Sequence, residues 1–574
     1  MDKVSKKNKM TVAGLKIIQL REKFNSFDID GYIVPKNDEF FSEFSIKDRL
    51  RTISNFTGSA GCAIILKNKN YLFVDGRYTI QAKKESGKNF KITKYEKLVN
   101  CNLFKNLTLG FDPALFTAKQ IKRFFLKYNK VKKIEKNLVD FKKNQLRSKP
   151  FFSLKTLITG ENYSKKIKKV SKFLKKNNSN YLFVTAPENV AWLLNIRGHD
   201  NPYSPVPHCR LLINDKKKFF LFSEFKKTRK LIDEKKLIKK QIIDPKNFEK
   251  FINKFKKGKI IIDQKTCSIS YENLLKKKFK ILNKKDPIYL LKSQKNKKEI
   301  KNMIDCHIAD GIAVSKFLYW IKNINKKKIT ELDAQKKLEN LRKKNKNYLF
   351  PSFDTIAGTA ENGAIVHYKA NRRETKEIKK NDIFLCDSGG QYKYGTTDVT
   401  RTICFSKPRT EIKNIFTKVL KGHIAVVTAN LNKYTSGRMI DNLARKNLKK
   451  DGLDYEHGTG HGVGFFLNVH EGPQAISKFN RVKIREGMII SNEPGYYKKG
   501  KFGIRIENLI YVSRSGRKLI FKNLTLAPID KDLIDFNQLD RKEKNYLFRY
   551  HLDVYNKISK FLSKNERKWL ASFI

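Results

Sequence analysis

Leu385-Cys-Asp-Ser-Gly-Gly-Gln-Tyr-Lys-Tyr-Gly-Thr-Thr-Asp-Val-Thr-Arg401 is the most informative segment of this 574-residue chain. It carries two aspartates, Asp387 and Asp398, on what read as neighbouring short strands. Aspartate beside glycine is most often a turn residue, so the pair alone carries little weight. Two carboxylates placed in this way are nevertheless a possible start of a metal site.

Three later segments add the other side chains that such a site needs. They read His457-Gly-Thr-Gly-His-Gly-Val-Gly464, Asn492-Glu-Pro-Gly495 and Gly503-Ile-Arg-Ile-Glu-Asn508. Each places a possible ligand beside glycine, proline or alternating apolar residues. That arrangement fixes a side chain at a strand end and draws the backbone close.

Together these segments supply four carboxylates and one imidazole, but no thiolate. This donor set suits harder divalent ions such as Mn²⁺ or Co²⁺ better than a structural zinc site. Two such ions, about 3.5–4 Å apart, hold a hydroxide between them and polarise a carbonyl group. The pattern therefore predicts a two-metal hydrolase with the ligands Asp387, Asp398, His461, Glu493 and Glu507.

Three further motifs make the pattern recognisable. They are Asn362-Gly-Ala-Ile-Val-His-Tyr368, Gly395-Thr-Thr-Asp-Val-Thr-Arg-Thr402 and Asn468-Val-His-Glu-Gly-Pro473. With them, the chain resembles the three-domain Xaa-Pro aminopeptidases (aminopeptidase P), metallopeptidases of family M24 with the pita-bread fold. The resemblance implies two similar amino-terminal α/β domains before a catalytic domain with a curved, mostly antiparallel sheet and outer helices.

The resemblance also implies a role for each ligand. Asp387 would bind one metal ion, and His461 and Glu493 would bind the other. Asp398 and Glu507 would bridge both ions. Glu493 would also act as general base towards the bridging hydroxide. We expect Mn²⁺, with Co²⁺ and Zn²⁺ as open alternatives.

Five more residues lie in or beside the matching motifs. By resemblance, His367 would stabilise the oxyanion, while His457 and His470 would form part of the proline pocket and move protons. A neutral imidazole suits that work. Arg505 would orient a carboxylate or contact the downstream end of the substrate. Tyr497 would line the same pocket, and an aromatic core residue is an equal interpretation.

The remaining histidines lie outside these motifs. An isolated histidine is more often a satisfied structural residue than a catalyst. We therefore predict structural roles for His199, His208, His307, His423 and His551.

The expected substrate follows from the chemistry of proline. A bond to proline is a tertiary amide without an N–H group, and the ring fixes the backbone, so a dedicated pocket is needed. By resemblance, the chain would hydrolyse the bond between an amino-terminal residue and a following proline. Its partners would be peptides with a free amino terminus and a second copy of the chain in a homodimer.

Length and composition limit the other classes. A chain of 574 residues is too long for one ordinary core, and about three domains are expected. It lacks the run of roughly 18 uncharged apolar residues that a membrane span requires. Residues Met1–Lys9 are basic but are not followed by the apolar core of an export signal. Seven cysteines without a Cys-x-x-Cys pair indicate reduced, buried thiols, so we expect a cytoplasmic protein.

The net charge of +69 is unusual for a peptidase. A surplus of Lys and Arg raises the question of nucleic acid, because these side chains neutralise phosphates. Here the lysines are scattered through every segment, and neither an RNP-like aromatic motif nor zinc-finger spacing accompanies them. We therefore interpret the charge as a solvated surface and expect no specific nucleic-acid partner.

The amino-terminal half carries signs of an internal duplication. Residues 1–150 alternate strand-like runs such as Asn70-Tyr-Leu-Phe-Val74 with lysine-rich helices. Residues 151–292 repeat that pattern, with Asn180–Thr185 as a first strand and Phe219–Phe222 as a later one. Both units could be architectural, and the resemblance implies that they cover the active-site cleft and aid dimer assembly.

The third unit is expected over residues 293–574. Ile300, Ile304, Ile308 and Ile312 recur at four-residue spacing, which predicts a scaffold helix with one packed face. A second amphipathic helix, ending at Trp569, is expected in the tail. Its aromatic residues would serve a dimer interface or pack onto their own domain, and the sequence favours neither.

Related functions compete with this prediction. A prolidase would cleave only dipeptides, and a methionine aminopeptidase would lack the two preceding domains. Creatinase works without metal ions and would not need the complete ligand set. A non-catalytic binding protein with the same fold would typically have lost ligands, whereas all five positions carry liganding side chains.

Overall fold

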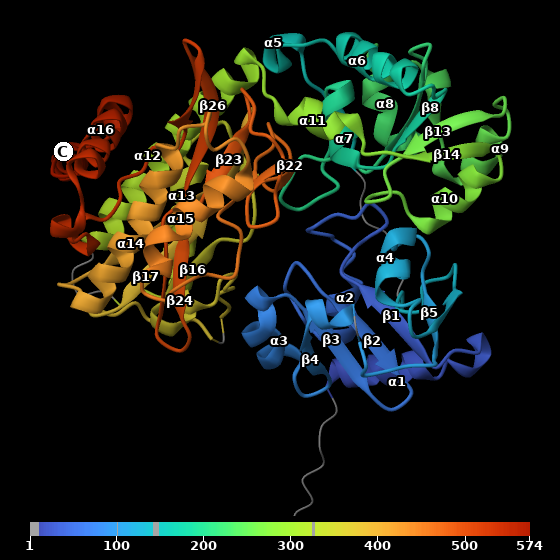
Figure 1. Cartoon of the computed structure of the whole chain (residues 1–574), viewed down its shortest axis with the longest axis horizontal. Helices are drawn as coiled ribbons and strands as arrows, with labels where there is room; N and C mark the ends of the chain where they lie inside the picture. The colour runs from blue at the N-terminus through green and yellow to red at the C-terminus, as the bar shows by residue number, and fades with distance from the viewer. Residues whose placement is uncertain (1–10, 100, 142–148, 324–327, 373) are drawn as a thin grey trace, which may run out of the picture.

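The computed structural model describes residues 11–99, 101–141, 149–323, 328–372 and 374–574. The basic segment Met1–Lys9, which is not expected to begin an export signal, lies outside these residues. Figure 1 shows three bodies. The first (blue) and second (teal to green) lie one above the other, and both stand beside the third (yellow to red).

The first body is a six-stranded sheet in the order β4-β3-β2-β1-β5-β6. Strand β1 pairs antiparallel with β2 and parallel with β5. Pair β2–β3 is antiparallel, and pairs β3–β4 and β5–β6 are parallel. The strands are β1 (Gly31–Pro35), β2 (Cys62–Leu66), β3 (Asn70–Val74), β4 (Lys91–Lys94), β5 (Thr108–Phe111) and β6 (Lys130–Lys133). The helices are α1 (Val12–Arg21), α2 (Arg49–Ser54), α3 (Thr79–Ser86) and α4 (Ala118–Phe124).

The second body is a six-stranded sheet in the order β12-β11-β10-β8-β13-β14. Its principal strands are β8 (Tyr181–Val184), β10 (Arg210–Asn214), β11 (Phe219–Phe222), β12 (Ile242–Ile243), β13 (Gly258–Ile262) and β14 (Phe279–Asn283). A small pair, β7 (Phe152–Ser153) and β9 (Ile196–Arg197), stands apart. The helices are α5 (Thr156–Thr159), α6 (Tyr163–Lys176), α7 (Pro187–Leu194), α8 (Phe225–Asp233), α9 (Phe248–Ile252) and α10 (Ile269–Lys276).

The two sheets share one topology. Strand β8 pairs antiparallel with β10 and parallel with β13, as β1 does with β2 and β5. The next pairs also repeat, antiparallel for β10–β11 and parallel for β11–β12 and β13–β14. Helices α2 and α7 both end at an asparagine in the left-handed region, Asn55 (φ 64°) and Asn195 (φ 54°). The agreement supports the predicted internal duplication.

The third body contains only antiparallel strand pairs among those described. Its sheets are β15-β18-β19, β16-β17-β20, β22-β21-β23-β26-β27 and β24-β25. The strands that carry the site are β16 (Ile356–Thr359), β17 (Ile383–Ser388), β20 (Val399–Cys404), β21 (Gly460–Gly462), β22 (Glu471–Ile476), β23 (Ile489–Asn492), β24 (Gly495–Lys498), β25 (Phe502–Arg505) and β26 (Asn508–Ser515). The others are β15 (Tyr348–Pro351), β18 (Gly390–Tyr392), β19 (Gly395–Thr396) and β27 (Lys518–Asn523).

Helices pack against these sheets. They are α12 (Lys297–Lys322), α13 (Glu331–Lys343), α14 (Thr410–Val427), α15 (Gly437–Lys449), α16 (Arg541–Ile558) and α17 (Lys564–Ala571). In one apolar cluster, Ile415 and Phe416 of α14 join Ile504 of β25 and Val554 of α16. The core of the third body therefore lies between the strands that carry the site and the outer helices.

Two details differ from the sequence-based expectation. The four isoleucines of the predicted stripe in α12 are only partly buried. The most deeply buried residues of this helix include Met303 and Phe317. The tail forms two helices because a new one starts at Ser563, whose side chain accepts a hydrogen bond from the Glu566 N–H group. Val554 and its neighbours in α16 pack onto their own domain.

Buried polar contacts lie at the junction of the second and third bodies. Helix α11 (Pro287–Ser293) connects them, and the expected boundary at 292/293 falls within it. Lys292 and Lys295 both donate to the Glu471 carboxylate, the first at 2.7 Å. Arg197 donates to the carbonyl oxygens of Phe465 and Phe466 at 3.0 and 2.6 Å. Since separating the bodies would remove two acceptors from the buried Arg197 charge, this contact resists their separation.

Asp286, the N-cap of α11, gives a prediction for the pH dependence of stability. Its carboxylate accepts hydrogen bonds from Ile288 N and Asn189 Nδ2 at 2.9 and 2.8 Å. Burial nevertheless raises the pKa of Asp286 to about 7. The contribution of this group to stability is therefore lost as pH rises from about 4, its unfolded value, through about 7.

Replacing Asp286 with asparagine removes this ionisation. Asparagine still caps the helix, and rotation of the Asn189 amide, whose Oδ1 is buried and unpartnered, restores their hydrogen bond. We expect the free energy of unfolding to exceed the wild-type value at pH 8 by up to about 4 kcal/mol, with little difference near pH 4. Melting temperatures across this range measure it. Asp244→Asn, at another N-cap of this body, is the control, and parallel profiles for D286N and wild type would contradict the prediction.

The structure also bears on membranes and thiols. Among the described residues, none of the helices has both the length and the apolarity that crossing a bilayer requires. All seven cysteines are free and buried, as predicted.

Candidate active site

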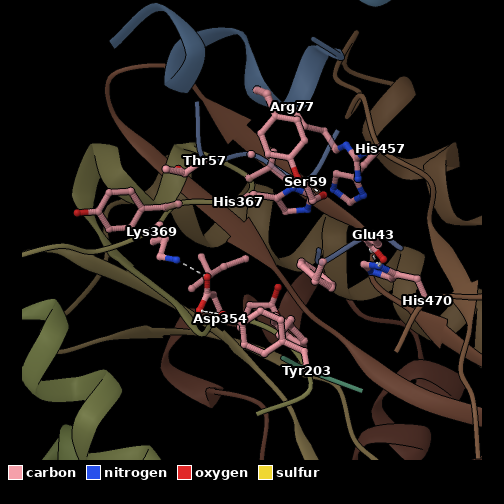
Figure 2. Close-up of a pocket in the computed structure, with 18 of the residues that line it drawn as sticks. Glu43, Thr57, Ser59, Arg77, Tyr203, Asp354, His367, Lys369, His457 and His470 are labelled. Carbon is pink, nitrogen blue, oxygen red and sulfur yellow. Dashed lines mark hydrogen bonds and ion pairs between the residues drawn. The ribbon is translucent and has the colours of Figure 1, made fainter. Parts of the chain in front are cut away.

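A cavity of about 680 Å³ lies where the three bodies meet, and Figure 2 shows part of its wall. The first body contributes residues such as Glu43 and Tyr78, and the second contributes Tyr203. The third body contributes all five predicted metal ligands. The structure thus gathers into one cavity side chains that are far apart in the sequence.

Paired strands position the two aspartates. Asp387 in β17 lies opposite Thr400 of β20, and Asp398 directly precedes β20. Both carboxylates are buried. Asp387 Oδ2 accepts a hydrogen bond from Arg505 Nη2 at 2.5 Å, while Oδ1 is buried and has no hydrogen-bond partner among the residues that the structure describes. The unsatisfied oxygen is a free ligand atom within the site.

Glu507 is held against the same strand. It lies between β25 and β26, and its Oε2 accepts a hydrogen bond from Thr400 Oγ1 at 2.7 Å. Its backbone N–H donates to the Thr400 carbonyl at 3.1 Å. The buried Arg401 guanidinium donates to the Glu507 carbonyl and to Asn508 Oδ1. Arg401 therefore braces the ligand-bearing strands and does not face the cavity ligands.

His461 and Glu493 are fixed by one serine. Ser491 Oγ accepts from the His461 N–H at 2.9 Å and donates to Glu493 Oε1 at 3.1 Å. Strands β21 and β23 approach closely here, since a Cβ atom on Gly460 would lie 1.9 Å from the Ser491 carbonyl oxygen. Glycine beside His461 is thus required by packing, as the motif predicted.

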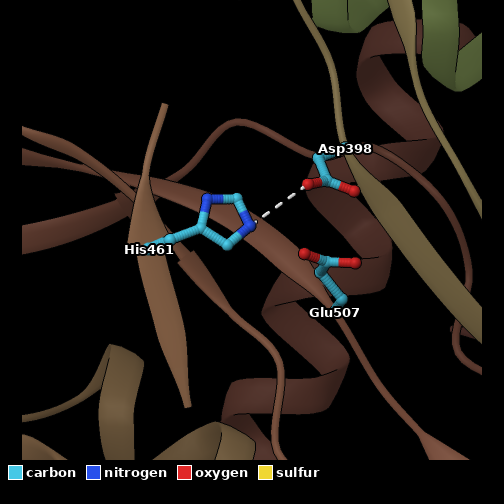
Figure 3. A group of neighbouring side chains, drawn as sticks. All are labelled: Asp398, His461 and Glu507. Carbon is cyan, nitrogen blue, oxygen red and sulfur yellow. Dashed lines mark ion pairs between the residues drawn. The ribbon is translucent and has the colours of Figure 1, made fainter. Parts of the chain in front are cut away.

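Three ligand groups converge within a few ångströms. Ligand atoms of Asp398, His461 and Glu507 lie within 4.8 Å of one another (Figure 3). His461 Nε2 lies 3.4 Å from Asp398 Oδ2 and 3.6 Å from Glu493 Oε1. The ring donates through Nδ1–H to the Gly462 carbonyl at 3.0 Å. That bond turns the Nε2 lone pair towards the carboxylates, which is how a metal-binding histidine is oriented.

The cluster is electrostatically strained. Burial, with the charges of Asp387 and Glu493, raises the pKa of Asp398 to about 6. Burial and the same carboxylate neighbours raise the pKa of Glu507 well above its usual value. Burial opposes a charge on His461, but its contacts with Asp398 and Glu493 raise the pKa to about 9.

Added positive charge would stabilise the ionised carboxylates and reverse these pKa shifts. Buried carboxylates at this density ionise together only when cations compensate them. The free Asp387 Oδ1, the oriented His461 Nε2 and the oxygen-rich donor set all fit divalent metal ions.

Arg505, Tyr497 and His457 form a hydrogen-bonded chain behind Asp387. Arg505 Nη1 donates to Tyr497 Oη at 2.6 Å, and the Tyr497 hydroxyl donates to His457 Nε2 at 2.9 Å. His457 Nδ1–H donates to the Gly458 carbonyl at 2.7 Å. Burial and the charge of Arg505 lower the pKa of His457 to about 3, so the ring is neutral. Because both nitrogens are engaged, His457 holds Tyr497 and Arg505 in place, and this geometry gives it no free nitrogen for moving protons.

The first body touches the other two predicted histidines. His367, after the 3-10 turn Ala360–Ala364, meets Tyr78 Oη through Nδ1 at 2.5 Å. His470, just before β22, donates from Nδ1 to both Glu43 oxygens at 2.8 and 2.7 Å. Neither Glu43 nor Tyr78 was predicted from the sequence as a site residue.

A further group of side chains lines the same cavity. Asp354 accepts hydrogen bonds from Tyr203 of the second body and from Lys369 of the third. Figure 2 shows these side chains on the side of the cavity away from His470. No motif in the sequence linked them, since Tyr203 and Asp354 belong to different bodies.

The histidines with predicted structural roles lie outside this cavity wall. His307, His423 and His551 are buried, and His551 Nε2 accepts a hydrogen bond from Ile529 N at 3.1 Å. His208 stacks on Phe40 of the first body at a centroid distance of 4.3 Å.

Four carboxylates and one imidazole in the wall of one cavity, on antiparallel sheets backed by helices, define a metal-dependent hydrolase. Comparison with known proteins agrees. Residues 301–514 match the model of metallopeptidase family M24, and residues 518–572 match its C-terminal region. Residues 16–148 and 142–299 each match a creatinase/prolidase N-terminal domain.

Full-length relatives narrow the class. A probable Xaa-Pro aminopeptidase P from Laccaria bicolor is 37% identical over 593 residues, which covers 97% of this chain and 92% of the relative. X-prolyl aminopeptidase from Caenorhabditis elegans, a cytosolic enzyme with a di-nuclear active site, matches with a TM-score of 0.90 at 30% identity, over 98% of this chain and 99% of that one. Prolidase from Pyrococcus furiosus matches with a TM-score of 0.50 at 26% identity, over 62% of this chain and 98% of that one.

The chain therefore belongs to metallopeptidase family M24, in the group of three-domain Xaa-Pro aminopeptidases, and it is a peptidase. The predicted fold class, two creatinase-like domains followed by a pita-bread domain, is confirmed.

Proposed function

We propose that this chain removes the amino-terminal residue from peptides whose second residue is proline, using two divalent metal ions. The observation that carries the proposal is the convergence of Asp387, Asp398, His461, Glu493 and Glu507 at one cavity. The full-length match to the C. elegans enzyme with its di-nuclear active site supports it.

In the proposed ligand assignment, Asp387 would hold one ion, and His461 and Glu493 would hold the other. Asp398 and Glu507 would contact both ions, and the pKa of each is raised by burial among neighbouring carboxylates. When bound, two such ions lower the pKa of water and polarise a carbonyl group.

The chain's own residues perform the remaining steps. Glu493 accepts a proton from the attacking water, and its anchored Oε1 leaves Oε2 for that proton. His367 donates a hydrogen bond to the carbonyl oxygen of the scissile bond as negative charge develops there. The carbon–nitrogen bond then breaks, and the proline nitrogen takes the proton that Glu493 holds. Arg505 keeps Asp387 oriented through its 2.5 Å ion pair.

Three other features are part of the proposal. We infer Mn²⁺ as the resident ion from the oxygen-rich donor set, and elemental analysis of the purified protein decides between it and Co²⁺ or Zn²⁺. A cytoplasmic location is supported by the cytosolic C. elegans relative and by the seven buried free thiols. A homodimer remains a prediction that light scattering tests directly.

Dipeptide and tripeptide substrates separate this proposal from a prolidase. The cavity of about 680 Å³ has room for residues beyond proline, since pockets of about 300–1,000 Å³ hold drug-sized ligands. We expect a tripeptide with proline second to be cleaved with a kcat/KM at least equal to that of the corresponding dipeptide. Product analysis by chromatography measures both, and a strict dipeptide preference would show that the chain is a prolidase.

A further inference from the structure

The first body places two sequence motifs against the active-site cavity. They are Phe56-Thr-Gly-Ser-Ala-Gly61 and Asp75-Gly-Arg-Tyr78, in the unit for which the sequence left an architectural or a cleft-covering role open. In the structure, Ser59 and Arg77 line the cavity near His367 (Figure 2). Tyr78 lines it too, in contact with His367. Tyr78 is only 2% exposed. These residues belong to the wall that faces the metal ligands.

Ser59, Tyr78 and His367 form one hydrogen-bonded chain. Ser59 Oγ lies 2.7 Å from Tyr78 Oη, which lies 2.5 Å from His367 Nδ1. The Tyr78 and His367 rings are 5.0 Å apart at their centroids. Phe56 packs edge-on against Tyr78 at 5.6 Å, which limits where the phenol can move. The phenol has one proton, so it donates to one of its two neighbours.

The chemistry of the three groups decides which one donates in each hydrogen bond. Burial, with the charges of Arg77 and Arg505, lowers the pKa of His367 well below its usual value, so the imidazole is neutral. Burial raises the pKa of Tyr78, so the phenol is protonated. A phenol is a stronger donor than an aliphatic hydroxyl, and imidazole nitrogen is a stronger acceptor than hydroxyl oxygen. Ser59 therefore donates to Tyr78, and Tyr78 donates to His367 Nδ1.

The direction of these hydrogen bonds determines whether the other ring nitrogen of His367, Nε2, carries a proton. A neutral imidazole that accepts at Nδ1 carries its proton on Nε2. We propose that Tyr78 is a positioning residue that fixes His367 as the Nε2–H tautomer, so that this histidine is a hydrogen-bond donor towards the substrate carbonyl. The inference rests on the proposed function, and it makes the first body part of the catalytic apparatus as well as a cover.

Tyr78→Phe tests the inference because it removes only the hydroxyl. The direct readout is the tautomer of His367, observed by NMR of full-length protein labelled with ¹⁵N-histidine and loaded with diamagnetic Zn²⁺. The signal is assigned with His367→Gln. We expect the Nε2–H form in wild type and a mixture of tautomers in Y78F. We also expect kcat on a tripeptide to fall about tenfold with KM nearly unchanged, since one hydrogen bond is worth about one power of ten.

Matched variants separate positioning from general damage. Tyr32→Phe is the control, because Tyr32 is equally buried in the same core, and its hydroxyl accepts only from Leu138 N at 3.4 Å among the bonds described. We expect no change in Y32F. In an H367Q background, Y78F should cause no further loss of kcat, as required for a residue that acts through His367. Ser59→Ala, a milder change, should shift the tautomer balance in the same direction.

An unchanged His367 tautomer in both Y78F and S59A overturns the inference. So does a loss of kcat in Y78F that persists in full when His367 is already glutamine. Failure of the proposed function looks different. Wild-type protein would not cleave peptides with proline second, or H367Q would be fully active, whatever tautomer the NMR signal reports.

Discussion

Replacing Glu493 with glutamine is expected to lower kcat/KM for a tripeptide with proline second by about 10³-fold while the protein stays folded. General acid–base catalysis contributes about 10²–10⁴-fold, and glutamine cannot accept a proton. Its amide has the same shape and can still accept from Ser491 Oγ, the donor that holds Glu493 now. The melting temperature should therefore change little, and steady-state kinetics with purified protein measures the loss.

A control variant and a metal measurement show whether Glu493 acts as the base. Glu486→Gln is the control, because it removes one negative charge from the same domain at an exposed pair with Arg514. It should retain wild-type kcat/KM. Elemental analysis of E493Q then separates two causes, since loss of metal would indicate a ligand role and retained metal would isolate the role as base. Full activity in E493Q would rule out Glu493 as the base.

The predicted metal ligands came from local backbone patterns. His461 and Glu493 each stand beside a glycine or proline, and the glycine at 460 is explained by its close approach to the Ser491 carbonyl. Such constraints restrict the residue directly beside the ligand, so they leave a readable trace in the sequence next to it. The alternation of strands and helices in the two amino-terminal bodies was predictable for a similar reason, because each strand follows from a local run of apolar residues.

Contacts made over long sequence distances left no such trace. Tyr78 meets His367 across 289 residues, and Glu43 meets His470 across 427. Neither contact follows from periodicity or spacing, because each depends on how the first body docks against the third. The buried face of α12 is a milder case. The isoleucine spacing identified a helix, but tertiary packing placed Met303 deeper than the isoleucines.

Metal binding should be confined to one of two similar acidic groups. The described residues contain two clusters of possible ligands, Asp398 with His461 and Glu507, and Cys404 with Asp530 and Asp532. In the second cluster an ammonium group already supplies the positive charge. Lys322 Nζ donates to both Asp530 oxygens at 3.0 and 2.8 Å, to Asp532 at 2.8 Å and to the Cys404 carbonyl. The first cluster has no lysine among its described partners, and its carboxylates have raised pKa values because of burial and mutual repulsion.

Asp398→Asn and Asp532→Asn therefore have opposite expected outcomes. Asparagine at 398 keeps the size of the side chain but removes a charge from the proposed bridge between the ions. Bound metal should drop below the wild-type amount. The value of kcat/KM should fall about 10³-fold, because metal ions supply several kcal/mol of transition-state stabilisation and each lost 1.4 kcal/mol costs a factor of about ten. Asparagine at 532 leaves Lys322 with both Asp530 oxygens, so metal content and activity should match wild type. Elemental analysis and steady-state kinetics on the same preparations measure both. Unchanged metal in D398N, or metal loss in D532N, would place the ions somewhere other than the cavity.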